Sequence, residues 1–271
     1  MLRYKIAAAI LAGYISTQAS AQELFVYTEP ASNMASGTAG IRASNWLMNE
    51  TQAGRINYHF IPEIMLGVNK RLMLHAEGFF SNRTSSFVAE GGGIYAKYRF
   101  YSKDQVYHHF RMAAFTRIAL NNADIPQEEI DMNGHNTGIQ AGMIATQLLH
   151  KTAISATAYY QRAFDNLDNH PLPDAMQPDA INYSLSAGRL ILPRHYSSYT
   201  QVNLNIMLEV LGQVLPAAGK QFIDIAPSVQ FIINSQTRVD VGYKFEMFSN
   251  MQRTAPNGLL VRMEHLLYHI L

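Results

Sequence analysis

The chain ends in Gly258-Leu-Leu-Val-Arg-Met-Glu-His-Leu-Leu-Tyr-His-Ile-Leu271, where apolar and charged residues alternate. In an extended strand Val261 and Met263 fall on one face, whereas Arg262 and Glu264 fall on the other. A period of two with this division predicts a strand whose two faces meet different surroundings. The apolar face must be covered by something, and the nature of that cover decides the fold.

The rest of the chain supplies no amphipathic helix beyond its first two dozen residues that could cover an apolar sheet face. Lipid is then the natural cover, and a membrane accepts strands only where no sheet edge is left unpaired. A final strand with no tail beyond it fits a barrel whose first and last strands pair. We therefore expect an all-β fold, a closed antiparallel transmembrane β-barrel.

The ending also resembles that of Gram-negative outer-membrane β-barrel proteins, the porin-like and small-transporter superfamily. In these proteins the last strand carries an apolar or aromatic final residue, and Leu271 stands here where Phe is usual. The resemblance implies a place in the cell outer membrane, contact with outer-membrane lipid, and recognition by the barrel-assembly machinery during biogenesis. Its motifs are general, so it implies a superfamily and names no substrate.

Composition excludes several other classes. With 271 residues, a formal net charge of +1 and 15% charged residues, the chain is not a nucleic-acid binder by charge. A mean hydropathy of -0.08 is far too low for a helical membrane protein. The absence of cysteine excludes disulfides, thiolate metal sites, a Cys nucleophile and a lipid-modified Cys anchor.

The N-terminus has the pattern of a secretory signal peptide. Basic residues in Met1–Lys5 precede an apolar run over 6–15, and Ala19-Ser20-Ala21 precedes Gln22. A helical span needs about twenty apolar residues, so this shorter run disfavours a membrane anchor. The expected organisation is a cleaved signal peptide over 1–21, an N-terminal periplasmic segment over 22–35 and the barrel over 36–271.

About twelve alternating runs have the length that a membrane strand requires. Tight turns alternate with longer polar connections, notably 82–89, 121–133 and 166–179. Outer-membrane barrels keep their short turns on the periplasmic side, and an even strand number puts both termini there. The expected strands are 36–48, 54–67, 71–81, 90–101, 105–119, 134–149, 151–164, 180–192, 197–211, 221–233, 237–249 and 258–271.

Each run separates into an apolar face, assigned to lipid, and a polar face, assigned to the lumen. In the ninth run, for example, Leu204 and Ile206 oppose Asn203 and Glu209. The main structural rival is a soluble two-sheet sandwich, which would bury the same apolar residues in a protein core. Strands of more than ten residues with charges evenly spaced on the inner face favour the barrel.

Charged residues on the expected inner faces form two groups. The first joins the last two strands, where Lys244 and Glu246 are expected to mesh with Arg262 and Glu264 as cross-strand ion pairs that support the barrel. The second is a basic wall on the fourth and fifth strands, which could concentrate anions. Its members are Lys97, Arg99, His109, Arg111 and Arg117, and the nearest inward acids, Glu63 and Glu77, could instead neutralise it through lumen ion pairs.

The pattern predicts no metal, cofactor or catalytic site. His75 and Glu77 share a face, but two ligands are too few for a metal site. Ser155, Ser184 and Ser186 lie on expected strands without a histidine two or three residues away on the same face. A lipid hydrolase like the outer-membrane phospholipase is therefore the least favoured function.

The favoured function is a channel or transporter for small polar solutes, with anions as one candidate class. The alternative is a non-conducting outer-membrane platform for a partner protein, which would bind the loops 121–133 and 166–179. Conductance separates these two hypotheses. No nucleic-acid partner is expected, and the sequence identifies no particular partner protein.

Overall fold

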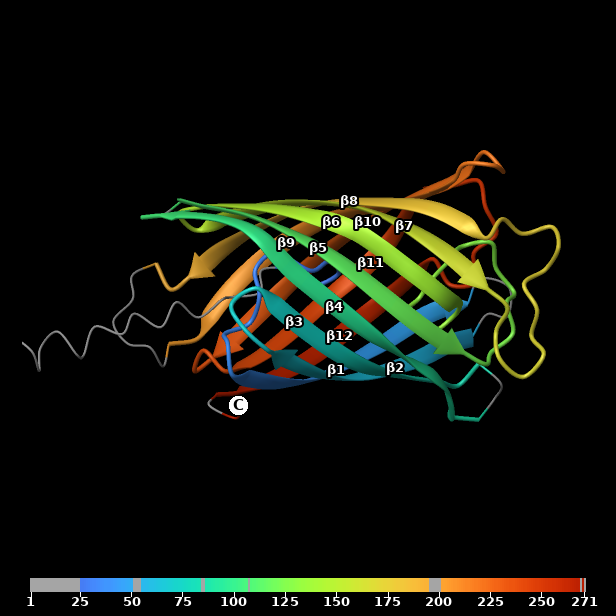
Figure 1. Ribbon diagram of the computed structural model, residues 1–271, viewed down its shortest axis with the longest axis horizontal. Helices are drawn as coiled ribbons and strands as arrows, with labels where there is room; N and C mark the ends of the chain where they lie inside the picture. The colour runs from blue at the N-terminus through green and yellow to red at the C-terminus, as the bar shows by residue number, and fades with distance from the viewer. Residues whose placement is uncertain are drawn as a thin grey trace, which may run out of the picture.

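The computed structural model describes residues 25–50, 55–83, 86–106, 108–194, 201–268 and 270, which form a closed barrel of twelve antiparallel strands (Figure 1). Each strand pairs with its neighbour in sequence, and β1 (Thr38–Glu50) pairs with β12 (Asn257–Leu267) to close the barrel. The predicted all-β barrel is confirmed. The expected signal peptide, 1–21, lies outside the described residues. Within the described ranges, no helix is long and apolar enough to cross a membrane.

The strands follow the predicted order, with most ends within three residues of the expected ones. The largest difference is the ninth strand, predicted at 197–211 and found at Asn203–Leu215, with residues 197–200 of the prediction outside the described residues. It runs on through Gly212 and Gln213, where the alternation of apolar residues is interrupted. The other strands are β2 (Arg55–Gly67), β3 (Leu72–Ser81), β4 (Val88–Gln105), β5 (His108–Asn121), β6 (Thr137–Leu149), β7 (Thr152–Phe164), β8 (Asp179–Leu192), β9 (Asn203–Leu215), β10 (Lys220–Ile233) and β11 (Thr237–Ser249).

The two faces of the barrel wall differ as the alternation predicts. On β2, Ile64 is 59% exposed on the outside while Glu63 is 8% exposed on the inside. On β12, Met263 is 56% exposed and Glu264 is 3% exposed. A single sheet that closes on itself offers no second layer to cover this outer apolar face, so the sandwich alternative is wrong. An apolar outside and a polar inside are the surfaces that a bilayer demands of a barrel.

Two segments outside the strands fold into the barrel, one from each end. The first, called the N-terminal insert, is residues 25–35; Val26 and Ala31 in it are fully buried. It reaches the start of β1 by passing over Gly67, where a Cβ atom would lie 2.1 Å from the Ala35 carbonyl oxygen. Part of the segment 22–35, expected to lie in the periplasm, thus lies inside the barrel, enclosed by its wall.

The second segment, called the loop insert, is residues 122–136 between β5 and β6. Its Ile130 and Met132 are almost completely buried in an apolar cluster that includes Phe79 and Phe222. Met132 packs against Gly138, where a Cβ atom would lie 2.3 Å from the Met132 methyl carbon. Because apolar burial stabilises by roughly 25 cal/mol per Å², this cluster holds the loop insert inside the lumen.

Candidate functional site

The lumen contains a cavity of about 220 Å³ between the N-terminal insert and the loop insert. Tyr27 and Glu29 of the N-terminal insert and Glu129 and Asp131 of the loop insert line it. Strand residues complete the lining, among them Trp46, Tyr95, Phe115, Arg117, Gln140, Asn182, Gln213 and Lys244. The cavity is therefore bounded by two pieces of chain that are continuous with the barrel but not part of its wall.

A single buried carboxylate on β9 anchors the N-terminal insert. Oε1 of Glu209 accepts hydrogen bonds from the amides of Val26 (2.9 Å) and Tyr27 (2.8 Å). Oε2 accepts from the Thr28 amide (3.0 Å) and the Thr28 hydroxyl (2.6 Å). These hydrogen bonds pair backbone amides that lie outside any sheet and would otherwise be buried without partners. Glu209 thus holds the insert in the middle of the barrel.

Glu29 provides a second attachment for the N-terminal insert. Its carboxylate lies 3.0 Å from Nη1 of Arg42 on β1 and 3.1 Å from Nζ of Lys97 on β4. Lys97 also donates to the Pro30 carbonyl oxygen at 2.8 Å. Burial acts to raise the pKa of Glu29, but the charges of Lys97 and Arg42 outweigh it and hold the pKa well below its usual range. The Glu29 carboxylate is therefore ionised at neutral pH.

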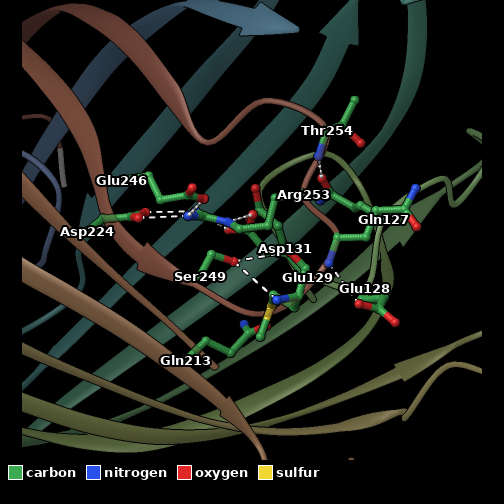
Figure 2. Close-up of polar contacts among 12 residues, drawn as sticks. Gln127, Glu128, Glu129, Asp131, Gln213, Asp224, Glu246, Ser249, Arg253 and Thr254 are labelled. Carbon is green, nitrogen blue, oxygen red and sulfur yellow. Dashed lines mark hydrogen bonds and ion pairs between the residues drawn. The ribbon is translucent and has the colours of Figure 1, made fainter. Parts of the chain in front are cut away.

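Arg253, in the connection between β11 and β12, clamps the loop insert (Figure 2). Its guanidinium donates to Glu129 of the loop insert at 2.7 and 3.2 Å and to both oxygens of Asp224 at 2.7 Å. It also reaches Glu246 at 3.1 Å and lies over the Phe222 ring, 3.7 Å from the centroid. Three acids therefore share one arginine whose side chain is only 1% exposed.

Further polar contacts fix the backbone of the loop insert on either side of Glu129. Lys220 forms an ion pair with Glu128, whose other oxygen accepts from the Gln252 amide at 2.7 Å. Gln213 on β9 brackets Ile130, accepting from its amide at 2.9 Å and donating to its carbonyl oxygen at 2.8 Å. The loop insert is thus held by residues of β9, of β10 and of the connection between β11 and β12.

Titratable groups of the loop insert differ in charge state. Burial acts to raise the pKa of Glu129, but Arg253 and Lys244 outweigh it and lower that pKa. For Asp131, burial and then the Glu129 charge raise the pKa above the usual range, because the hydrogen bond from the Asn133 amide and the charges of Lys244 and Arg117 offset them only in part. Burial, with Arg83 nearby, holds the pKa of His135 well below its ordinary value, so His135 is neutral.

Asp131→Asn is expected to increase the free energy of unfolding by about 0.5–1 kcal/mol at pH 7. A folded-state pKa above the unfolded one favours the protonated form in the folded protein, so the stabilising form is lost as pH rises. Asparagine removes the ionised form and keeps an oxygen to accept the 2.8 Å hydrogen bond from the Asn133 amide. Urea unfolding at pH 7 and pH 4 measures the change, which should shrink at pH 4; a larger gain at pH 4 would contradict the assignment.

The structure divides the basic wall of the sequence analysis into two parts. Lys97 and Arg117 lie in mid-lumen beside acids, Lys97 with Glu29 and Arg117 with Glu77 at 3.1 Å. The other members of the basic wall, Arg99, His109 and Arg111, lie toward the end of the barrel where β4 turns into β5. There Arg111 and His109 contact Asp104 at 3.0 and 2.8 Å, and Arg99 donates to the Lys70 carbonyl oxygen at 2.6 Å.

Every residue expected to form a lumen ion pair has a charged partner. However, the ion pairs expected between Lys244 or Glu246 on β11 and Arg262 or Glu264 on β12 do not form. The register pairs Asp240 with Arg262 and leaves Lys244 opposite Gly258. Glu246 consequently reaches Arg253 and not Arg262. The contacts are Glu63–Arg42 (3.3 Å), Glu77–Arg117 (3.1 Å), Lys244–Asp224 (3.7 Å), Arg262–Asp240 (3.9 Å), Glu264–Arg42 (2.8 Å) and Glu264–Arg238 (2.6 Å).

The serines that were considered as nucleophiles face the lumen and are buried. The Ser155 hydroxyl donates to the Ala145 carbonyl oxygen at 3.2 Å and bonds the Thr146 hydroxyl at 2.8 Å. Ser186 donates to Glu209 at 3.2 Å. These contacts link strands and the N-terminal insert, which gives both serines a structural role.

No protein-family model matches the chain, and no curated protein matches its sequence. Among solved structures, an outer-membrane channel from Pseudomonas putida F1 is 10% identical, with 90% of this chain and 100% of that chain covered and a TM-score of 0.58. OccAB2 of Acinetobacter baumannii is 10% identical, with 85% and 63% covered and a TM-score of 0.41. OccK2 of Pseudomonas aeruginosa is 7% identical, with 85% and 96% covered and a TM-score of 0.39. The match to the Pseudomonas putida channel shows that this chain shares the β-barrel fold of that protein.

Proposed function

We propose that the protein is an outer-membrane channel for small polar solutes whose lumen is held closed by its own N-terminal insert and loop insert. The observation that carries the proposal is the cavity of about 220 Å³ between these two inserts. The similarity of fold to an outer-membrane channel supports it. In a barrel of twelve strands, between filled eight-stranded and open sixteen-stranded examples, the inserts occupy the space that a conducting path requires.

Both inserts are attached in a way that allows them to be released. The N-terminal insert is bound through Glu29 and Glu209, and the loop insert through Arg253 and Gln213. These polar contacts between separate parts of the chain can be exchanged for contacts with water or solute, whereas the apolar contacts of Ile130 and Met132 must also be broken when the loop insert moves. Backbone pairing of the barrel wall does not depend on them, so the inserts can move while the wall stays closed.

The lining favours small solutes that both donate and accept hydrogen bonds. Four amide side chains form a ladder across β6 to β9, with bonds from Gln161 to Gln140 (3.1 Å), Asn182 to Gln161 (2.8 Å) and Gln213 to Asn182 (2.8 Å). The cavity volume is below the roughly 300–1,000 Å³ of sites for drug-sized ligands. A neutral amide wall and a small volume together fit small polar molecules.

Reconstitution of the purified protein into planar bilayers tests the proposal. We expect low conductance interrupted by openings, because the two inserts must move out of their closed positions before ions can pass. Swelling of proteoliposomes in small sugars or amino acids would extend the measurement to uncharged and zwitterionic solutes. A protein that is folded, as shown by heat-dependent gel mobility, and never conducts would reject the channel and favour the non-conducting platform.

Arg99→Gln is expected to shift ion selectivity toward cations. Arg99 makes its hydrogen bond to a backbone oxygen, whereas Lys97 and Arg117 lie beside acids that offset their charges. An uncompensated positive charge near the path raises the local anion concentration. The effect should fade with salt, because the Debye length falls from about 10 Å at 0.1 M to about 3 Å at 1 M.

Reversal potentials across a salt gradient measure this shift. Arg189→Gln is the matched control, because Arg189 lies on the exposed outer face of β8. Selectivity should change for position 99 and stay constant for position 189. Equal shifts in the two variants would show that net charge, and not the position of Arg99, sets the preference.

A further inference from the structure

One cluster of carboxylate and imidazole side chains on the inner wall has no part in the proposed closure of the channel. Glu63 on β2 and His75 and Glu77 on β3 each offer one ligand atom, and these atoms all lie within 4.8 Å of one another. We propose that these three residues form a binding site for a divalent transition-metal ion, with Zn²⁺ as the ion that fits the donor set best. The sequence alone showed only His75 and Glu77 on one face.

Strand register supplies the third ligand. Glu63 lies directly opposite Glu77 in the β2–β3 ladder, and His75 lies two residues before Glu77 on the same inner face. Two carboxylates directly opposite each other repel when both are ionised. A cation placed between them would convert this repulsion into attraction.

The spacing suits first-row metal coordination. Nδ1 of His75 lies 3.3 Å from Oε2 of Glu63. Two ligands bonded at about 2.0–2.1 Å to a tetrahedral ion lie about 3.3–3.4 Å apart. A rotation of the Glu77 side chain would bring its oxygen to the same ion. Three protein ligands would leave the fourth position to water or to a solute.

Unmet hydrogen-bonding capacity points to a ligand at this place. Both carboxylate oxygens of Glu77 are buried and have no hydrogen-bond partner, although Oε1 lies 3.1 Å from Nη2 of Arg117. The side chains of His75 and Glu77 are each only 2% exposed. Buried polar atoms in folded proteins are nearly always paired, and a bound ion is one of the few explanations when protein partners are missing.

Two nearby arginines would oppose a cation unless they can turn away. Arg42 lies 3.3 Å from Glu63, and Arg117 lies 3.1 Å from Glu77. Arg42 also contacts Glu29 and Glu264, at 3.0 and 2.8 Å, and Arg117 also donates to Asn133. Each guanidinium therefore keeps a partner when a metal ion takes Glu63 and Glu77.

The donor set selects among metals. Ca²⁺ takes six to eight oxygen ligands and Mg²⁺ keeps most of its water, so neither favours an imidazole. Imidazole with carboxylates suits Zn²⁺ and its first-row neighbours, and the chain has no cysteine to attract softer ions. Arg117 lines the central cavity and contacts Glu77, which puts the site beside that cavity.

Isothermal titration of the tag-free protein in detergent with ZnCl₂, and with CaCl₂ for comparison, tests the site. We expect one Zn²⁺ per chain and no comparable heat with Ca²⁺. Glu77→Gln and His75→Ala should each weaken Zn²⁺ binding by at least about tenfold, the scale of losses seen when a metal site is disturbed. The control is His108→Ala, which removes one ring of the surface pair His108 and His150, whose centroids are 5.3 Å apart.

Heat-dependent gel mobility checks that each variant is folded, and conductance is not needed for any readout. Absence of stoichiometric Zn²⁺ binding by the unaltered protein would overturn the proposal, whatever the variants do. Binding that survives Glu77→Gln but is lost in His108→Ala would also overturn it, because the surface pair would then be the site.

Discussion

Replacing Arg253 with alanine is expected to lower the free energy of unfolding by about 3–5 kcal/mol, the scale for removing one partner of a buried ion pair. The substitution leaves Asp224, whose side chain is 1% exposed, and Glu129 without their shared cation. It also removes the guanidinium from the Phe222 ring. Burial alone would lower the pKa of Arg253, but Glu129 and Asp224 raise it above its ordinary value, as expected for a cation held by buried acids.

Urea unfolding in detergent, followed by the fluorescence of the single tryptophan Trp46, measures this loss. The matched control is Arg162→Ala, because Arg162 also pairs with an aspartate but is 48% exposed. Exposed pairs contribute about 0–1 kcal/mol, so the control should remain close to the unaltered protein. Combining Arg253→Ala with Asp224→Asn should recover part of the loss. Equal effects at positions 253 and 162 would show that Arg253 is not a buried clamp.

Deleting residues 25–35 is expected to raise single-channel conductance several-fold. The deletion removes the N-terminal insert from the lumen and leaves β1, which starts at Thr38, able to pair with β12. Glu209→Ala should act in the same direction with a smaller effect, because it removes the acceptor of the Val26, Tyr27 and Thr28 amides. Asp179→Asn is a control at an exposed carboxylate that pairs with Arg162. Unchanged conductance after deletion would show that the insert does not close the path.

The barrel and its faces could be predicted because one physical rule acts along every strand. Because lipid lies outside the wall and the interior is polar, apolar and polar residues alternate with a period of two along each strand. The face on which a residue such as Met263 or Glu264 lies therefore follows from its position in the strand alone. The limit appeared at the ninth strand, where Gly212 lies beneath Tyr183 on the outer face and offers no apolar side chain there, which interrupts the apolar pattern. There the strand end depends on pairing with β8 and β10, which a single-strand pattern does not contain.

Ion-pair partners could not be predicted for a related reason. Which residue lies opposite Arg262 depends on how many residues the β11–β12 connection uses, and the pairing with Asp240 follows from that register. Sequence spacing favoured Glu246, which the register moves away to Arg253 in the connection itself. The charges of the last two strands were therefore assigned to the wrong partners, whereas Glu77 does pair with a member of the basic wall, Arg117.

The inserts lie beyond the reach of strand periodicity, because neither residues 25–35 nor 122–136 alternate. One signal could have pointed to the N-terminal insert. Glu209 was expected on the inner face of its strand, yet its neighbours on the adjacent strands are Ser186 and Ala226, so no cation there balances it. A buried carboxylate without a cation on either neighbour implies a partner from another part of the chain, and the amides of Val26, Tyr27 and Thr28 are that partner.

A reversible covalent lock on the N-terminal insert tests most directly whether the insert closes the channel. The Thr28 and Ser186 hydroxyl oxygens lie 2.9 Å apart, and the chain has no cysteine of its own, so Thr28→Cys with Ser186→Cys places two sulfurs within bonding reach. Single-channel recordings before and after a reductant are compared with those of Thr28→Cys alone. The account predicts that the oxidised double variant stays closed and that reduction restores openings, with no response from the single variant. An oxidised channel that conducts as well as the reduced one would contradict closure by the insert.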